Sequence, residues 1–368
     1  MKERKPAPEF KESDLKQEPI ERAETIPSDW YHSEAVLDFE EEHLFSKHWQ
    51  LACHESQIPN PGDMHTLEVA GNPILIVRDQ ENKLRAFYNV CKHRGGPVAV
   101  KKGTTSVLQC KYHGWTYLLD GSLRGVPQFN KVDLFDKKDF GLEPIPLKTW
   151  QNFVFITLSP NKRPLDKYLE GINKRISPIN LGCFEHYTDK SYKLECNWKV
   201  YVDNFLEGYH IPIVHPELAK LLDYKNYAVE TSHWYSLQYS PLKEENNIYG
   251  KGKGKAFYYF IFPNIMLNIL PGRLQTNVIR PISIDKTEVL FSFYYEDIES
   301  KETRKTIKND ISYSHEIQME DIDICEQVQK GLKSDAYNKG RFSVEREEGV
   351  YHFQSLLKKV FRKSISSL

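Results

Sequence analysis

Two pairs of cysteine and histidine lie close together in the first third of the chain. Cys91 and His93 form the first pair, and Cys110 and His113 form the second after sixteen intervening residues. Two thiolates and two neutral imidazoles can hold a [2Fe–2S] cluster, with sulfur ligands on one iron and nitrogen ligands on the other. The neutral nitrogens raise its reduction potential to between about −150 and +300 mV. The motif therefore predicts a cluster that relays electrons to an oxidant.

A zinc ion is the competing interpretation of these four residues. Structural zinc also binds two thiolates and two imidazoles, but its common spacing pairs Cys with Cys and His with His. Here each short segment carries one of each, and glycines that suit tight turns stand beside both segments. The arrangement favours the diiron cluster. Cys53, Cys183 and Cys196 have no such partners in the sequence and are expected to be buried apolar residues.

A second group of potential metal ligands follows between residues 203 and 215. It contains Asp203, Glu207, His210 and His215. On an unbroken helix the two histidines would stand about 140° apart and could not share an ion. Pro212 lies between them and is expected to break the helix, so that both imidazoles can face one point. A mononuclear iron that activates oxygen takes two histidines and one carboxylate and keeps positions open.

The carboxylate is expected from a long helix predicted at about 299–332. A polar stripe on that helix is expected to face solvent, and it consists of Glu316, Glu320, Asp323 and Gln327. Asp321 falls on the opposite, apolar stripe, which consists of Ile317, Cys325, Val328 and Leu332. A carboxylate buried there is costly unless it is paired or binds a metal. We predict that Asp321 is the third ligand; a buried aspartate bonded to backbone amides is the alternative.

Composition sets limits on the kinds of protein this can be. The chain has 368 residues, of which 40% are hydrophobic and 27% charged, which suits about two globular domains. A formal charge of −1 gives no reason to expect nucleic acid or a membrane surface as a partner. No apolar run is long enough to span a membrane, and the N-terminal residues are not expected to act as a secretory signal. Six cysteines in this length do not form a disulfide scaffold, so a cytoplasmic location is expected.

Local patterns divide the chain into three parts. Residues 1–47 are expected to be a mobile charged tail, up to about residue 24, followed by a helix that Ser33 caps and that reaches Trp49. Residues 48–160 are rich in β patterns, clearest at 73–78 and 153–158, with a hairpin turn at Asp120-Gly121. Residues 161–368 contain the histidine segment, a strand at 289–295 and the long helix. A basic glycine-rich stretch at 250–255 is expected to be a surface loop.

Taken together, these motifs resemble the oxygenase (α) component of the Rieske non-haem iron oxygenases. The resemblance runs through residues 26–31, 87–96, 110–115, 197–215, 320–321 and 329–332. It implies an α+β fold, in which an antiparallel β Rieske domain joins a catalytic domain with a large antiparallel sheet flanked by helices, of the helix-grip type. The implied cofactors are one [2Fe–2S] cluster and one mononuclear Fe(II) per subunit. A homotrimer is also implied, with the cluster of one subunit facing the iron of the next.

The resemblance also assigns roles to the two carboxylates near the histidines. Glu207 would join His210 to His113 of a neighbouring subunit and carry electrons between the metal sites, and Asp203 would tune the site or its proton supply. Many ring-hydroxylating members have aspartate at the position of Glu207. The longer side chain is more similar to the branch that acts on choline, betaine or carnitine. The alternative is an ordinary glutamate on a helix surface.

The implied activity is hydroxylation, by one or two oxygen atoms, of a small organic substrate with O₂. That substrate is an aromatic ring compound or a quaternary amine, and aromatic residues within 234–262 could line its pocket or surround a cation. Because the chain has no dinucleotide-binding glycine motif, a separate NAD(P)H-dependent reductase is expected, with or without a ferredoxin. A Rieske-type electron-transfer protein without oxygenase activity is the alternative, although it would need only the first module.

Overall fold

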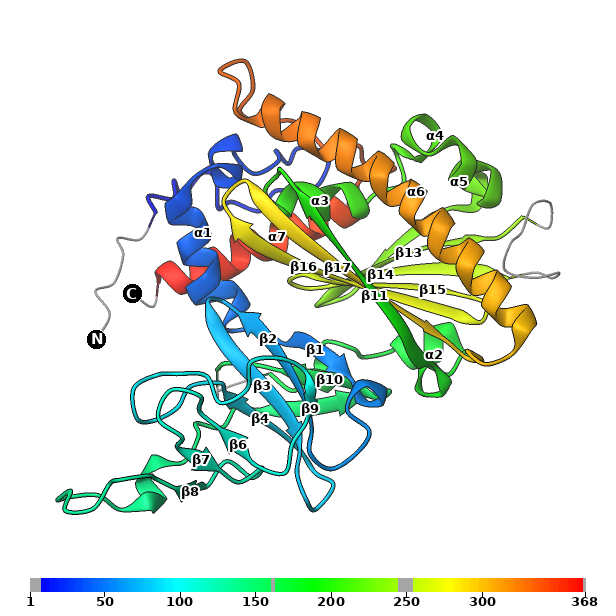
Figure 1. Cartoon of the computed structure of the whole chain (residues 1–368). Helices are drawn as coiled ribbons and strands as arrows, with labels where there is room; N and C mark the ends of the chain where they lie inside the picture. The colour runs from blue at the N-terminus through cyan, green and yellow to red at the C-terminus, as the bar shows by residue number, and fades with distance from the viewer. Residues whose placement is uncertain (1–7, 160–162, 244–253, 367–368) are drawn as a thin grey trace. The chain divides into compact units, whose positions relative to one another are not determined.

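The computed structural model describes residues 8–159, 163–243 and 254–366. The chain divides into two compact units (Figure 1). The small unit is Phe45–Arg163, and the large unit joins Met1–Leu44 to Pro164–Leu368. Among the described helices, none is long and apolar enough to cross a membrane. Most of the glycine-rich stretch at 250–255 lies outside the described residues.

Three antiparallel sheets make up the small unit. Their strand orders are β1-β10-β9, β4-β3-β2-β5 and β6-β7-β8. The strands are β1 Gln50–His54, β2 Asp63–Val69, β3 Asn72–Arg78, β4 Leu84–Tyr88, β5 Gly103–Thr104, β6 Leu108–Gln109, β7 Thr116–Tyr117, β8 Leu123–Gly125, β9 Leu147–Trp150 and β10 Phe153–Ile156. Both predicted strands are present, as β3 and β10. The predicted turn at Asp120-Gly121 joins β7 to β8, and the positive φ of 89° at Gly121 suits glycine.

Two hydrophobic cores stabilise this unit. One contains Cys91, Cys110, Trp115 and Tyr117, so the cysteine loops are anchored in it directly. The other lies between the first two sheets, where the β-branched residues of β3 pack against β10. The loops are therefore held by a rigid framework.

A single seven-stranded antiparallel sheet organises the large unit, in the order β11-β17-β16-β15-β14-β13-β12. The strands are β11 Glu185–Leu194, β12 Ala228–Thr231, β13 Tyr235–Pro241, β14 Lys255–Ile261, β15 Ile265–Leu270, β16 Arg273–Ser283 and β17 Lys286–Tyr295. The described α-helices are α1 Glu34–Glu40, α2 Ile172–Ile176, α3 Trp198–Phe205, α4 Ile211–Val214, α5 Pro216–Leu221, α6 Lys301–Leu332 and α7 Glu348–Ile365, and a 3-10 helix spans Ser28–Tyr31.

One face of this sheet carries the long helices α6 and α7 together with α3 (Figure 1). Phe353 of α7 packs on Phe260 of β14 and on Trp198 of α3, which forms an apolar half. Under α6 the same sheet face is polar, because Arg273, Gln275 and other buried polar residues stand there. The α+β fold with a large antiparallel sheet flanked by helices confirms the predicted fold class.

The N-terminal segment differs from its prediction. Residues 8–24 were expected to be mobile, yet Leu15 and Ala23 are buried, and the Phe10 ring contacts the rings of Trp30 and Phe361. Apolar residues spaced among the charges therefore dock this segment on α7. The prediction of a mobile tail relied on charge and proline content and did not take these apolar residues into account.

The first helix is also shorter than predicted. It spans Glu34–Glu40 and ends in a π turn at Glu41–Phe45, so Trp49 is not helical. Ser33 occupies the N-cap position, but its side chain makes no capping hydrogen bond. The apolar residues near Trp49 instead lead into β1, which is buried along its whole length and pairs with β10.

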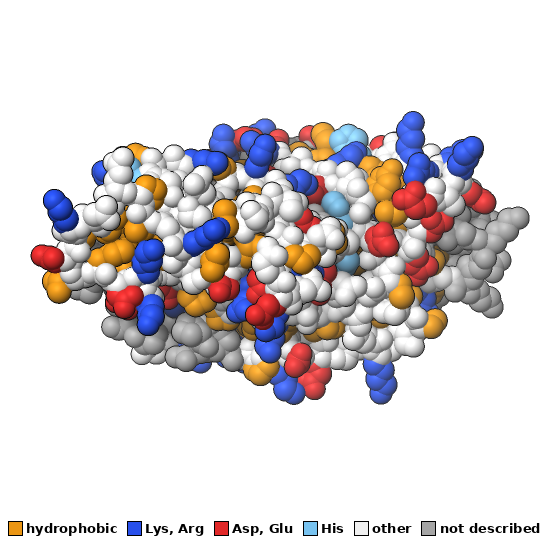
Figure 2. Space-filling view, turned by 60° about the horizontal axis from the view of Figure 1, so that its bottom comes forward, with side chains coloured by type: hydrophobic (Ala, Val, Ile, Leu, Met, Phe, Trp, Pro, Cys, Tyr) orange, Lys and Arg blue, Asp and Glu red, His pale blue; other side chains and the backbone are white. Residues whose placement is uncertain are grey.

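On Figure 2, charged side chains of both signs are interspersed with apolar ones over the visible face. This agrees with the near balance of 50 basic and 51 acidic residues. The three cysteines expected to be buried differ in their exposure. Cys53 and Cys196 are buried, whereas Cys183 is exposed because it ends a short 3-10 turn at the unit's surface.

Candidate metal centres

Two loops of the same construction carry the cysteine–histidine pairs. In the first, the amide of Cys91 donates to the Gly96 carbonyl and the amide of Gly95 to the Cys91 carbonyl, at 2.8 and 3.0 Å. In the second, Cys110 and Trp115 are bonded in the same way at 2.9 Å, and the Gly114 amide closes the turn. Gly95 and Gly114 have φ values of 76° and 73°, where side chains are disfavoured. The glycines expected from the sequence therefore shape both loops.

The two loops meet at their histidine rings and at Gly96. The rings of His93 and His113 are 4.6 Å apart between centroids, and His93 stacks on Trp115. A Cβ at Gly96 would stand 2.9 Å from the Cys110 Sγ, so this position has to remain glycine. The buried Nδ1 of His93 has no hydrogen-bond partner among the described residues. An unpaired imidazole nitrogen beside two buried thiols fits the donor set of a [2Fe–2S] cluster.

A buried tyrosine, Tyr117, contacts the first loop. The Tyr117 hydroxyl lies 3.2 Å from the Cys91 Sγ, and it accepts a hydrogen bond from the Lys92 amide at 3.0 Å. Because the Tyr117 oxygen accepts from the Lys92 amide, the proton of the same hydroxyl can be donated to the Cys91 sulfur. Sequence inspection did not identify this contact, because nothing in the spacing of Tyr117 distinguishes it from a core residue.

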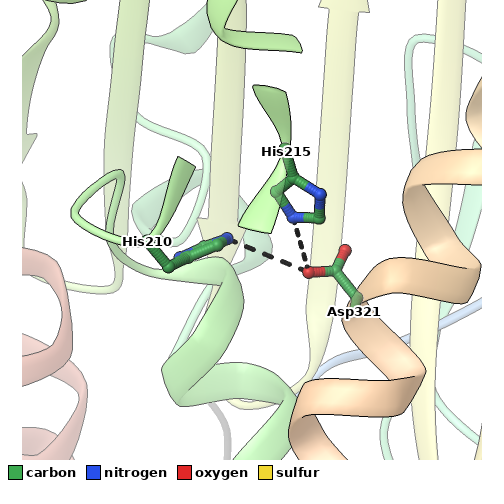
Figure 3. A group of neighbouring side chains, drawn as sticks. All are labelled: His210, His215 and Asp321. Carbon is green, nitrogen blue, oxygen red and sulfur yellow. Dashed lines mark hydrogen bonds and ion pairs between the residues drawn. The ribbon is translucent and has the colours of Figure 1, made fainter. Parts of the chain in front are cut away.

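The second group forms a compact centre in the large unit. One ligand atom each from His210, His215 and Asp321 lies within 4.8 Å of the other two, and the three could hold a metal ion. The Asp321 Oδ1 is 2.9 Å from the Nε2 of His215 and 3.9 Å from that of His210. Figure 3 shows both imidazoles directed at this carboxylate, which comes from α6. Asn204 donates to the same oxygen at 2.6 Å.

Each of the two histidines also has a carboxylate on its other ring nitrogen. Glu207 Oε1 lies 2.6 Å from the Nδ1 of His210, and Glu320 Oε2 lies 2.6 Å from the Nδ1 of His215. Such partners fix the ring orientation and leave Nε2 for a metal. Burial lowers the pKa of His215, but hydrogen bonds and charge from Asp321 and Glu320 outweigh it, so the pKa is raised. A bound cation would replace that proton.

Local chain geometry brings the two histidines together. Helix α3 ends at Phe205, and α4 begins at Ile211 with Pro212 in its first turn. The prediction that Pro212 breaks the helix between the histidines is therefore wrong in position. The break comes earlier, at residues 206–210, where Gly208 is required because a Cβ would stand 2.7 Å from the Tyr227 ring. His210 and His215 cap opposite ends of the single turn between them.

Helix α6 is less regular in polarity than its sequence stripe suggests. Val328 was expected on the buried side but is 44% exposed, while Gln318 and Gln329 are buried. Glu320 was expected to face solvent, and it is part-exposed, yet its carboxylate reaches His215. These differences arise because α6 packs on a polar sheet face and on the histidine segment.

Asp203 lies in a different environment from the metal ligands. Its carboxylate accepts hydrogen bonds from the Tyr31 hydroxyl at 2.5 Å and from Gln354 at 3.2 Å. Burial raises the pKa of Asp203 to about 7, against hydrogen bonds that lower it. It belongs to the packing between α3, α7 and the 3-10 helix Ser28–Tyr31, and it does not line the cavity beside the histidines.

A cavity of about 120 Å³ opens beside the three ligands. Its aromatic lining consists of Tyr201, Phe205, Tyr227, Tyr258, Phe291 and Tyr313. Of the aromatic residues within 234–262 that were predicted as candidates, only Tyr258 is among them. Phe260 and Phe262 pack on Phe353 instead, and Phe257 lies near the Arg175 guanidinium. The strand register decides which of these aromatic residues face the cavity, and the register cannot be read from the sequence.

Comparisons with known proteins agree with both centres. A family model for the Rieske [2Fe–2S] domain matches residues 48–139, and one for the catalytic domain of the ring-hydroxylating alpha subunit matches residues 182–362. Choline monooxygenase of Arabidopsis thaliana chloroplasts is 32% identical over 92% of this chain and 83% of its own length. The carnitine monooxygenase oxygenase subunit of Escherichia coli K12 is 31% identical over 93% and 95%. A solved quaternary ammonium Rieske monooxygenase superposes with a TM-score of 0.86 at 29% identity, covering 94% and 99%.

The chain therefore belongs to the Rieske non-haem iron oxygenases, as their terminal oxygenase component. The predicted cofactors, a Rieske [2Fe–2S] cluster and a mononuclear iron, are confirmed for this class. The zinc interpretation of the first motif is not supported. A catalytic domain after the Rieske domain also removes the alternative of a simple electron carrier.

Proposed function

We propose that this protein is a monooxygenase of a small quaternary amine, and that His210, His215 and Asp321 hold its mononuclear iron. The observation that carries the proposal is the convergence of these three side chains at the end of a small, aromatic-lined cavity. The overall reaction consumes substrate R–H, O₂, two electrons and two protons, and gives R–OH and water. NAD(P)H supplies the electrons through a separate reductase.

The residues around the ligands hold them in place. Glu320 orients His215 through Nδ1, and Asn204 donates to the Asp321 oxygen. Iron bound there would supply O₂ activation, because two histidines and one carboxylate leave coordination positions open. Cys91, His93, Cys110 and His113 would hold the cluster, whose chemistry is one-electron transfer. The chain's own contribution is to fix both donor sets.

Glu207 is proposed to connect the two kinds of centre between subunits. Its carboxylate already binds the Nδ1 and the backbone amide of His210, at 2.6 and 3.1 Å. His113 is exposed and can meet a carboxylate of another subunit. This arrangement needs a ring-shaped oligomer, and we propose a homotrimer. The similar solved monooxygenase is itself described in terms of inter-subunit electron transfer.

The remaining partners follow from the same class. We propose an NAD(P)H-dependent reductase as the electron donor, with a ferredoxin as an optional carrier. A reducing compartment such as the cytoplasm suits the six cysteines, all of which are free among the described residues.

The aromatic lining of the cavity supports a small cationic substrate. Tyrosine and phenylalanine rings attract a quaternary ammonium group through their faces. The relatives named for choline and carnitine oxidation act on compounds of this kind.

The substrate class is tested with coupled O₂ uptake. The purified protein is combined with a generic reductase and NADH and offered a panel of quaternary amines and aromatic acids, under ¹⁸O₂. We expect uptake coupled to quaternary amines, with one labelled oxygen in the product. Coupled uptake with aromatic acids alone, or two labelled oxygens, would contradict the proposal.

The role of Glu207 is tested by Glu207→Gln. The variant is expected to keep both metals and lose turnover. Glutamine has only one acceptor oxygen, so its side chain cannot accept hydrogen bonds from two histidines as the Glu207 carboxylate can. Glu217→Gln is the matched control, since Glu217 is exposed and bonded only to Lys220 in the described part of α5. Normal turnover of Glu207→Gln would refute the bridge.

A further inference from the structure

Two functional side chains lie in one short break between helices. Helix α3 ends at Phe205 and α4 begins at Ile211, and Glu207 and His210 lie between them. Glu207 accepts from the His210 amide at 3.1 Å, and its Oε1 lies 2.6 Å from the Nδ1 of His210. The backbone groups of such a break lack helical partners, so other elements have to hold it.

The break is packed from two sides. Leu206 is fully buried, and a Cβ at Gly349 of α7 would overlap the Leu206 carbonyl oxygen. On the other side the Tyr227 ring lies against Gly208, where a Cβ would stand 2.7 Å from the ring. The two residues that flank Glu207 therefore have little room to move.

A buried glutamine of β13 holds the end of α3. Gln238 is 1% exposed, and its Nε2 donates to the Phe205 carbonyl at 2.6 Å. The last carbonyls of a helix have no partner within the helix, and Gln238 supplies one. Its Oε1 accepts from the Tyr227 hydroxyl at 2.9 Å. Desolvation raises the pKa of Tyr227, and the nearby charge of Glu207 raises it further, so the hydroxyl keeps its proton for this bond.

The contacts of Tyr227 and Gln238 act on the same short piece of chain. Tyr227 packs on Gly208 and orients the Gln238 amide, while Gln238 binds the carbonyl two residues before Glu207. Two residues span at most about 7 Å of chain, so a shift at Phe205 reaches Glu207 directly. A buried amide that only filled space would be costly compared with an apolar side chain. This cost points to a positional role for Gln238.

We propose that Gln238 and Tyr227 are positioning residues for electron transfer, because they hold the end of α3 so that Glu207 keeps its hydrogen bond to His210. Removing the Gln238 donor takes this partner from the Phe205 carbonyl and lets the break relax, which weakens the contact between Glu207 and His210. The inference rests on the proposed role of Glu207 as the bridge between subunits. It adds two residues that bind neither metal.

Electron transfer is measured without substrate, because Tyr227 and Gln238 also line the cavity. The cluster is reduced by pulse radiolysis in protein whose mononuclear iron is ferric, and the decay of the reduced cluster gives the transfer rate. We expect Gln238→Leu to keep both metals and to slow the transfer about 5- to 10-fold, the worth of one buried hydrogen bond. Tyr227→Phe keeps the packed ring and is expected to slow it about two- to threefold. It carries the test alone if Gln238→Leu does not retain iron.

Ser240→Ala is the matched control. Ser240 lies on the same strand and is fully buried, and its hydroxyl donates to the carbonyls of Asp223 and Pro241, which lie outside the break. This variant loses buried hydrogen bonds of β13 without touching the end of α3, and it is expected to transfer electrons at the wild-type rate. Slowing equal to that of Gln238→Leu would mean a general structural effect and would refute the positioning role.

A spectroscopic measurement separates positioning from a general loss of structure. Nitric oxide bound to the ferrous site gives an EPR signal that reports the geometry of ligands such as His210. Gln238→Leu and Glu207→Gln are expected to change this signal in the same way, whereas Ser240→Ala leaves it unchanged. A wild-type signal in Gln238→Leu would count against the proposal.

A double variant tests whether Gln238 acts through Glu207. Glu207→Gln combined with Gln238→Leu should transfer electrons no more slowly than Glu207→Gln alone, because the effects of residues that act through one contact are not additive. Further slowing in the double variant, or a normal rate in both Gln238→Leu and Tyr227→Phe, overturns the positioning role and leaves the bridge standing. A normal rate in Glu207→Gln overturns the bridge itself.

Discussion

The hydroxyl of Tyr117 provides a quantitative test of the cluster site. It lies 3.2 Å from the Cys91 Sγ and accepts from the Lys92 amide, so its proton is directed to the sulfur. The side chain is fully buried. Hydrogen bonds to the sulfurs stabilise the more negative, reduced cluster and raise its potential. Tyr117→Phe removes this donor without changing the packed ring, so the potential should fall.

The size of the fall can be worked out from the one bond that is lost. A hydrogen bond contributes about 0.5–1.5 kcal/mol net. For a one-electron couple, 59 mV corresponds to a tenfold change in the equilibrium constant, so this energy equals about 20–65 mV. A redox titration followed by circular dichroism in the visible range measures the shift. Tyr88→Phe, a part-buried tyrosine of the same unit, is the control. An unchanged or higher potential in Tyr117→Phe would refute the reasoning.

Three further predictions concern the large unit. Glu320→Gln should weaken iron retention about 10- to 100-fold, because it loses the carboxylate on His215; dialysis against a chelator measures this, and Glu316→Gln should behave like wild type. Glu40→Ala should lower the free energy of unfolding by about 3–5 kcal/mol, since it leaves Lys199 charged and fully buried; urea unfolding tests this, and a loss below about 1 kcal/mol would contradict it. Asp203 has a pKa raised from 3.8 to about 7, so its ionisation opposes folding, and stability should fall as the pH rises from about 4 to about 7. Asp203→Asn should remove that part of the pH dependence in urea titrations at several pH values, and identical profiles would count against it.

Much of the chemistry was predictable because it depends on short motifs. The cysteine–histidine loops and the histidine segment contain their donors within a few residues, and the fold class was implied by the family that those motifs resemble. Asp321 lies more than 100 residues from His215. Its position on the apolar stripe of the predicted helix nevertheless indicated a carboxylate that needs a partner or a metal. The structure brings all three residues together.

Contacts between distant elements were not predictable in the same way. Glu320 belongs to a polar stripe, and only the docking of α6 on His215 shows that its carboxylate has a second role. The polar sheet face under α6 depends on strand register, which places Asn268 opposite Gln275. The alternation of Arg273, Gln275 and Asn277 within a buried strand was a visible signal that could have been read as a polar face.

Metal analysis of Asp321→Ala tests the central claim most directly. If Asp321 completes a mononuclear iron site that is separate from the cluster, the variant should lose about one iron per chain and keep its acid-labile sulfide and visible absorption. Asp323→Ala, an exposed residue on the same helix that bonds to Gln327, should retain the full iron content. Retention of that iron in Asp321→Ala, or its loss in Asp323→Ala alone, would contradict the assignment of the oxygen-activating centre.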